Sequence, residues 1–288
     1  MQMNNNLSVL PWYDSIELQN HRRSYAYGNV YPLYTKAMTV LPFQIVRPTR
    51  VNAIQSVLLY KFDGTLVGDL LTRMNETGLT VVRMPQYSYD VIVYYGVLPV
   101  LDVQEDGRYY AVMTDGVQTW YSEVWTVVQD VTPYLKIEWF NKENVVFDGG
   151  QIVYTNTTFR NILYLDTELG KPEYKFEEEG EDRDGFFFPE KQISEKVYKC
   201  VILAPEFLCD CMRLIRMADY VRITDKYGVK YNCDTFLITP EWQVQGDLAS
   251  VEIEFQTNTV VKRIGNGYPI PSGADFNDDY NDDYLINN

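Results

Sequence analysis

The chain has 288 residues and a mass of 33.6 kDa, which fits one large β domain or two modest domains with a sizeable buried core. It carries 25 Lys and Arg against 40 Asp and Glu, and a net charge of −15 disfavours binding to nucleic acid or to an anionic membrane. Aromatic residues make up 15% of the chain and favour half-buried strand positions, so the composition predicts a β-dominated protein.

Two segments hold most of the excess acid. Residues 177–184 (EEEGEDRD) contain six acids and one Arg, and residues 275–283 contain five acids and no base. The rest of the chain carries 24 bases and 29 acids, so the body is nearly balanced. Runs of like charge are usually solvated, which predicts an acidic loop and an acidic tail.

The first 40 residues are rich in Asn and Tyr and show no sustained apolar period. We therefore expect an N-terminal arm over 1–40 that docks against a partner instead of forming a core element. The extreme N-terminus lacks the basic and apolar regions of a secretion signal. No apolar run approaches the roughly 18 residues needed to span a bilayer, so we expect a soluble protein without membrane contact.

Residues 41–135 contain six short strand-like runs bounded by Pro, Gly, Asp or Asn, namely FQIV, AIQSVLLYKF, LTVVRM, YDVIVYYG, GRYYAVMT and WYSEVWTVV. Runs of this kind predict a β-sandwich. Asp115-Gly116 lies between the last two runs, and we expect it to supply the positive φ angles of a tight hairpin turn. The G-x-Y-Y strand followed by Y-S-E resembles the last strands of immunoglobulin-like and fibronectin type III modules.

Residues 136–264 predict a second β domain. Two strand-like runs, FRNILYLDTELGKPEYKF and GFFFPEKQISEKVYKCVIL, flank the acidic segment and predict a long hairpin with a charged tip. Pro205-Glu206 opens the one predicted helix, EFLCDCMRLIRM. Val251, Ile253 and Phe255 alternate with polar residues, which is typical of a strand with one buried face. Residues 265–288 have almost nothing to bury, and we expect an acidic disordered tail.

This order of strands, helix, hairpin and closing strand resembles the tail-tube fold of bacteriophage distal tail proteins, in which an extended hairpin joins neighbours in a ring. The stretches GRYYAVMTDGVQTWYSEVW, FRNILYLDTELGKPEYKFEEEGEDRDGFFFPEKQISEKVYKC and APEFLCDCMRLIRMADYVRI are similar to virion proteins of Bacteroides phages and prophages. The resemblance implies a tail or neck-to-tail structural protein, located in the virion after synthesis in the host cytoplasm.

The resemblance implies a homo-oligomeric ring that docks other virion proteins and makes no direct readout of nucleic acid. On such a hairpin, the acidic run would meet a basic patch of the next subunit. We expect the assembly interface to be made of aromatic residues in the arm and of the phenylalanines and glutamates of the hairpin: Tyr25, Tyr27, Tyr31, Phe186, Phe187, Phe188, Glu177, Glu178 and Glu179.

No pattern for catalysis, a cofactor or a metal stands out. The single histidine, His21, lies beside two arginines in the arm, and the common hydrolase and nucleotide-binding motifs do not occur. Cys209 and Cys211 form a C-x-C, but neither Cys200 nor Cys233 has a ligand partner at zinc-site spacing, so we expect free thiols. The aspartates of the tail lack the EF-hand order for calcium. The sequence predicts assembly without catalysis.

Two other functions stay open. A carbohydrate-binding module would attach a particle or an enzyme to glycans through exposed aromatic residues such as Trp120, Tyr121 and Trp125. A polysaccharide hydrolase would need a pair of carboxylates across a sugar, and Glu138 and Asp148 lie near aromatic residues. The simpler interpretation places these aromatic side chains in the core of the sandwich.

Overall fold

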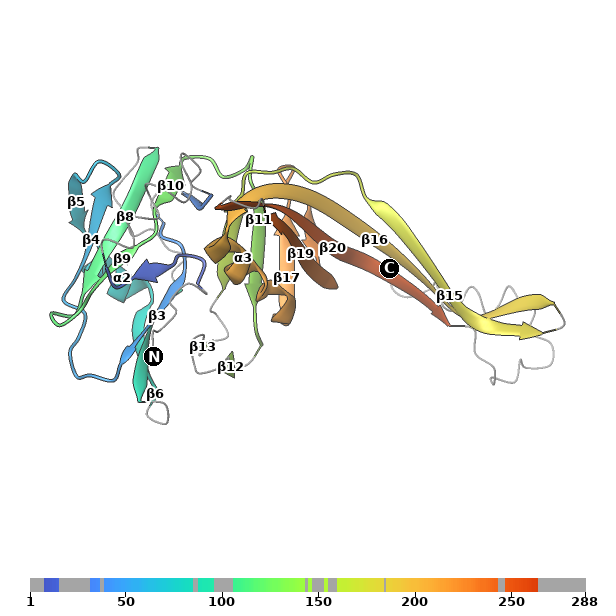
Figure 1. Cartoon of the computed structure of the whole chain (residues 1–288), viewed down its shortest axis with the longest axis horizontal. Coiled ribbons are helices and arrows are strands. Elements are labelled where there is room, and N and C mark those ends of the chain that lie inside the picture. The colour runs from blue at the N-terminus through green and yellow to red at the C-terminus, as the bar shows by residue number, and fades with distance from the viewer. Residues whose placement is uncertain are drawn as a thin grey trace. The chain divides into compact units, whose positions relative to one another are not determined.

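The computed structural model describes residues 8–15, 32–36, 39–84, 88–95, 106–142, 145–146, 153–154, 160–183, 185–242 and 247–263 (Figure 1). The chain divides into two compact units. Unit 1 comprises residues Met1–Glu173 and Lys196–Asn258, and unit 2 comprises Tyr174–Glu195 and Thr259–Asn288. The segments on either side of the expected boundary at 135 and 136 both belong to unit 1.

The N-terminal half of unit 1 is built from a mixed sheet, an antiparallel sheet and a helix. A seven-stranded sheet has the order β1-β9-β8-β10-β2, with β4 paired to β8 and β5 paired to β4. Its strands are β1 (Trp12–Tyr13), β2 (Tyr34–Lys36), β4 (Ser56–Lys61), β5 (Leu66–Asp69), β8 (Gly107–Thr114), β9 (Thr119–Ser122) and β10 (Trp125–Val128). The second sheet has the order β3-β7-β6, made of β3 (Phe43–Pro48), β7 (Tyr89–Tyr94) and β6 (Leu79–Met84). Helix α2 (Leu71–Thr77) lies between β5 and β6 in the chain.

The C-terminal half of unit 1 adds a sheet of order β14-β11-β17-β18. Its strands are β11 (Leu135–Phe140), β14 (Asn161–Leu165), β17 (Tyr220–Thr224) and β18 (Lys230–Asn232), and β12 (Val145–Val146) pairs with β13 (Val153–Tyr154). A further sheet, of order β15-β16-β20-β19, has residues in both units. It contains β15 (Glu173–Arg183), β16 (Phe186–Pro205), β19 (Thr235–Trp242) and β20 (Leu248–Arg263). Helix α3 (Glu206–Met212) and the short 3₁₀ turn η5 (Ile215–Met217) follow β16.

The described part of unit 1 holds two clusters of buried apolar side chains, and the larger of them contains residues from both halves of the unit. Strand β8 contributes Tyr109, Ala111 and Met113 to this larger cluster, and β20 contributes Val251, Ile253 and Phe255, each at alternate positions of its strand. The two-residue period places these side chains on one face, and polar or half-buried residues take the other. The predicted alternation of the closing strand is therefore confirmed.

The predicted fold class, β-dominated with a β-sandwich, is confirmed, with two corrections. The described residues contain two α-helices instead of one, because α2 is only seven residues long and buries Met74 alone, which leaves no periodic apolar stripe in the sequence. The predicted run WYSEVWTVV is divided into β9 and β10 by Glu123 and Val124, and both strands pair with β8.

The expectation of an arm outside the core is wrong for the described part of residues 1–40. Val9, Leu10, Trp12 and Leu33 are buried in the common core, and β1 and β2 belong to the seven-stranded sheet. Both strands are only two or three residues long, so they leave no alternation to detect. Long-range pairing, β1 with β9 and β2 with β10, holds them in place.

The hairpin between β8 and β9 turns at Asp115 and Gly116 as predicted, but the two residues have different roles. Gly116 has a φ of +81°, whereas Ser88 is the one described non-glycine residue with a positive φ. The carboxylate of Asp115 is buried and accepts hydrogen bonds from the backbone N–H groups of Val117 (3.0 Å) and Gln118 (2.8 Å).

Asp115 is also the centre of a buried ion cluster that joins the two N-terminal sheets. Its Oδ2 lies 2.7 Å from Nη1 of Arg47 on β3 and 3.3 Å from Nη1 of Arg50. Arg47 in turn lies 3.9 Å from Asp90 of β7. Burial acts to raise the pKa of Asp115, but the hydrogen bonds from Gln118 and Val117 and the two arginines outweigh it, so this pKa is lowered.

Candidate assembly surface

The acidic run that we predicted as a loop is part of a strand. Residues Glu177–Arg183 lie within β15, and Gly185, which has a φ of +82°, lies in the turn before β16 (Figure 1). Cross-strand contacts explain the difference, since Nε2 of Gln192 donates to Glu178 (2.6 Å) and Nζ of Lys191 donates to Glu179 (3.0 Å). These two contacts, one between opposite charges and one from an amide, stabilise the pairing of β15 with β16. The run of acids alone had suggested a solvated loop.

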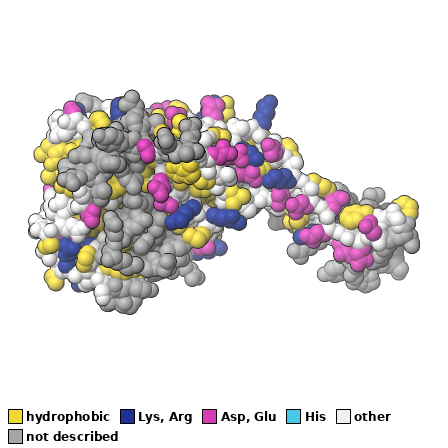
Figure 2. Space-filling view, in the orientation of Figure 1, with side chains coloured by type: hydrophobic (Ala, Val, Ile, Leu, Met, Phe, Trp, Pro, Cys, Tyr) yellow, Lys and Arg dark blue, Asp and Glu magenta, His cyan; other side chains and the backbone are white. Residues whose placement is uncertain are grey.

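Unit 2 has no core of its own among the side chains that the structure describes, because none of them is buried. Four aromatic side chains of the hairpin are exposed: Tyr174 by 74%, Phe176 by 62%, Phe186 by 70% and Phe187 by 46%. We call the hairpin part of unit 2, Tyr174–Glu195, the ribbon. Figure 2 shows yellow hydrophobic and magenta acidic side chains beside one another on it. Contiguous exposed apolar surface is a feature that monomeric proteins rarely show.

The sheet that contains the ribbon also has two unlike edges. Strand β15 is the edge of its sheet and carries Glu177, Glu178 and Glu179. On the other side, β19 pairs with β20 only from Ala249 to Gln256, so within the described residues the end of β20 extends past its β19 partner. That end carries the exposed Val260, Val261 and Lys262, followed by Arg263. One edge is acidic and the other is apolar and basic.

The structure brings together part of the predicted interface. Phe186, Phe187 and the three glutamates lie on the same exposed hairpin, whereas Phe188 belongs to β16 with a side chain outside the described set. Tyr25, Tyr27 and Tyr31 lie outside the described residues. Neither Tyr174 nor the end of β20 was singled out from the sequence, because apolar residues in a strand usually face a core.

The four cysteines are free thiols that belong to unit 1. Burial raises the pKa of Cys200 to about 12, of Cys209 to about 11 and of Cys233 to about 12, and it also raises the pKa of Cys211. Among the described residues, no group of three His, Cys, Asp or Glu side chains is placed to hold a metal ion.

The residues expected to bind sugars lie mostly in the core. Trp120, Trp125 and Trp139 are at most 1% exposed, so they offer no face to a glycan, and Tyr121 is half-buried. Glu138 lies 2.9 Å from Nζ of Lys136 in an ion pair, and Asp148 lies outside the described residues. These positions remove the support that Trp120 and Trp125 gave to the carbohydrate-binding alternative, which as a whole stays a prediction.

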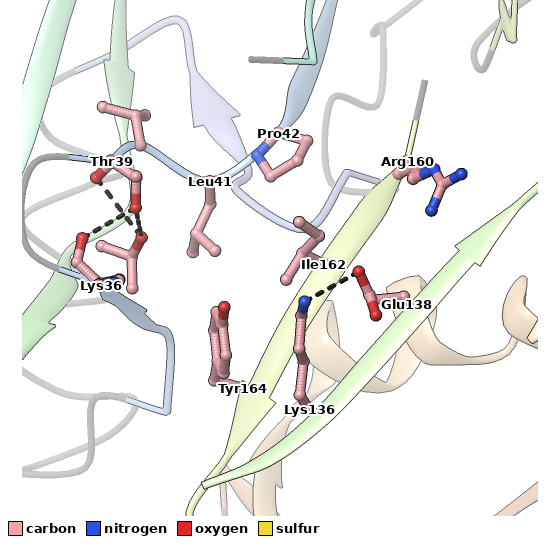
Figure 3. Close-up of a pocket in the computed structure, with 11 residues that line it drawn as sticks. Lys36, Thr39, Leu41, Pro42, Lys136, Glu138, Arg160, Ile162 and Tyr164 are labelled. Atoms are coloured by element: carbon pink, nitrogen blue, oxygen red, sulfur yellow. Dashed lines mark hydrogen bonds and ion pairs between the residues drawn. The ribbon is translucent and has the colours of Figure 1, made fainter. Parts of the chain in front are cut away.

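A second feature of unit 1 was not visible in the sequence. A pocket of about 440 Å³ lies between residues 35–36 and 39–42 on one side and strands β11 and β14 on the other (Figure 3). Three cations, Lys36, Lys136 and Arg160, line it together with the single acid Glu138. These residues are far apart along the chain, so only the fold brings them together.

Comparisons with known proteins add little. No family model matches the chain, and no curated protein matches it. Among solved structures, the N-terminal Ig1-2 module of the Drosophila receptor protein tyrosine phosphatase DLAR matches with 16% identity, covering 59% of this chain and 86% of that one. The TM-score of 0.19 is too low for the likeness to support an argument about fold or function. None of the helices in the described part of the chain is long and apolar enough to cross a membrane.

Proposed function

We propose that the chain is a structural component of a bacteriophage virion, in the tail or neck-to-tail region, which assembles into a ring and docks other virion proteins. The observation that carries the proposal is the part of the β15–β16 hairpin that belongs to unit 2, Tyr174–Glu195, which exposes four aromatic side chains and buries none of its described side chains. Burying a Phe side chain contributes about 1.5 to 3 kcal/mol, so a partner that covers this ribbon gains substantial free energy. The virion assignment itself rests on the sequence resemblance.

The unlike edges favour a head-to-tail contact between copies. Two β15 edges side by side would bring Glu177, Glu178 and Glu179 against the same glutamates, and like charges directly opposite are destabilising. The end of β20, with Lys262 and Arg263, is the complementary edge. A heterologous contact of this kind generates a closed ring or an open filament, depending on the rotation between copies.

Light scattering coupled to size-exclusion chromatography, followed by electron microscopy, tests ring formation. We expect the purified chain to form a closed oligomer, and Phe187→Asp to give a monomer with an unchanged melting temperature. Val51→Asp is the matched control, because Val51 is an apolar side chain of unit 1 that is 89% exposed. A wild-type chain that stays monomeric at high concentration, or a Phe187→Asp variant that assembles like the control, would refute the proposal.

The location in a virion needs a separate measurement. Antibodies against the chain should decorate tails or necks of purified particles of the phage that encodes it, in immunogold micrographs. Particles that contain none of the chain by mass spectrometry would remove the virion assignment and leave the assembly surface unexplained.

A further inference from the structure

The outer face of sheet β14-β11-β17-β18 is basic, although the chain as a whole is strongly acidic. Lys136 of β11 pairs with Tyr164 of β14 and Thr224 of β17, and Thr224 pairs with Lys230 of β18. Residues directly opposite in antiparallel strands share a face, so these four side chains form one row across the sheet. The next row places Glu138 between Ile162 and Arg222.

The pocket lies at the β14 side of this face (Figure 3). Leu41, Pro42 and Ile162 form apolar walls, and the hydroxyl of Tyr164 extends from β14 between Leu41 and Lys136. Glu138 is already engaged by Lys136 at 2.9 Å, and Arg160 stacks over Phe140 at 4.6 Å. Three cations against one acid, beside an apolar wall, suit a ligand that combines carboxylates with a ring.

Residues 277–284 of the chain have the chemistry of such a ligand. Asn277-Asp278-Asp279-Tyr280 is followed directly by a second copy of the same tetrad, Asn281-Asp282-Asp283-Tyr284. Each tetrad offers two carboxylates next to a tyrosine. The other acidic run, in β15, is one strand of a paired ribbon, and its neighbouring strand would prevent it from entering a pocket of about 440 Å³.

We infer that this pocket binds the N-D-D-Y segment, residues 277–284, of a second copy of the chain. The aspartates pair with Lys36, Lys136 and Arg160, and a tyrosine ring packs on Leu41 and Ile162. The choice of a second copy rests on the proposed ring, in which each copy offers one pocket and one segment to its neighbours. The segment then ties adjacent copies together at a place other than the hairpin.

Zero-length cross-linking of carboxylates to amines tests the contact in the full chain. Equal amounts of ¹⁴N-labelled and ¹⁵N-labelled protein are mixed and exchanged before treatment, and cross-linked peptides are identified by mass spectrometry. We expect cross-links from residues 278–283 to Lys36 or Lys136 that join light and heavy copies. Absence of these cross-links, or cross-links only within one isotope, would overturn the inference.

A peptide titration tests the chemistry. A fluorescent peptide of residues 275–288 is titrated into full-length protein whose own segment carries Asp278→Asn, Asp279→Asn, Asp282→Asn and Asp283→Asn. Adding Lys136→Gln and Arg160→Gln should weaken binding about tenfold or more, because charge-assisted hydrogen bonds are lost. The matched control, Lys171→Gln with Arg213→Gln, removes two cations outside the pocket lining and should bind like the parent.

Peptides with both tyrosines changed to serine report on the apolar wall, and we expect them to bind several-fold more weakly. Equal binding by the serine peptide, or equal weakening by the control variant, would mean unspecific charge attraction and would overturn the inference. The hairpin variant Phe187→Asp separates the two proposals. If it abolishes the ring while peptide binding fails in every variant, the proposed function stands and this inference falls. Peptide binding together with cross-links between light and heavy copies, in a chain that forms no ring, gives the reverse.

Discussion

Strand β8 of unit 1 and strand β15 of unit 2 both carry apolar side chains at alternate positions, but these side chains are buried in β8 and exposed in β15. In β8, Tyr109 and Met113 are fully buried beneath a second layer of strands. In β15, Tyr174 and Phe176 are mostly exposed, and every described side chain after the first strand residue is exposed as well. An apolar alternation therefore does not by itself show that the face packs in the core of its own chain.

The largest expected effect comes from removing a core aromatic residue. Trp120→Ala deletes a fully buried side chain of β9 and should lower the free energy of unfolding by about 3 to 5 kcal/mol, because it leaves a cavity. Phe176→Ala, the same kind of truncation in unit 2, should leave the stability of the monomer unchanged. Chemical denaturation of both variants measures the difference, and equal losses would show that the ribbon is packed within its own chain.

A slightly smaller loss is expected for Asp115→Asn. The change leaves the buried Arg47 without its closest carboxylate, at a cost of about 3 kcal/mol. Since the pKa of Asp115 is lowered from 3.8, the parent's advantage is present above that pH and disappears as the pH falls through the folded-state value. Denaturation curves of the parent and of Asp115→Asn measure this. Their free energies of unfolding should differ widely at pH 7 and little near pH 2, and an equal difference at both pH values would contradict this account.

Two glycines with the same backbone conformation give a matched pair with a moderate effect. Gly116 and Gly185 both have a positive φ, but a Cβ at Gly116 would run into the side chain of Gln55, whereas a Cβ at Gly185 meets nothing within 4 Å. Gly116→Val should destabilise the protein by about 1 to 3 kcal/mol. Gly185→Val should leave the main unfolding transition of unit 1 in place. Equal melting temperatures for Gly116→Val and the parent would place the strain elsewhere.

The smallest effect concerns reactivity and not stability. With a pKa of about 12, Cys200 and Cys233 hold only about one thiolate in ten thousand at pH 8, so a thiol reagent should label the folded chain very slowly. All four thiols should react at once in denaturant. Rapid stoichiometric labelling of the native chain would mean that the C-terminal half of unit 1 opens readily.

Local pattern was enough for many of the strands and for the turn at Gly116, since strand period and glycine conformation are properties of neighbouring residues. It was not enough for β1, β2 and α2, which are short and held by partners far along the chain. Charge was misleading at residues 177–183, because the pairing of Glu179 with Lys191 depends on the register of the hairpin. The pocket cations, Lys36, Lys136 and Arg160, could not be grouped without the fold.

The tip of the hairpin is a suitable place to insert a tag. Gly185 lies at a turn with open space around its backbone, and exposed tips of this kind tolerate inserted residues well. A small epitope or a fluorogenic tag placed there would be carried on the ribbon itself. Its accessibility or brightness would then follow, in real time and without disrupting the buried sheets, the moment at which a neighbour covers the ribbon.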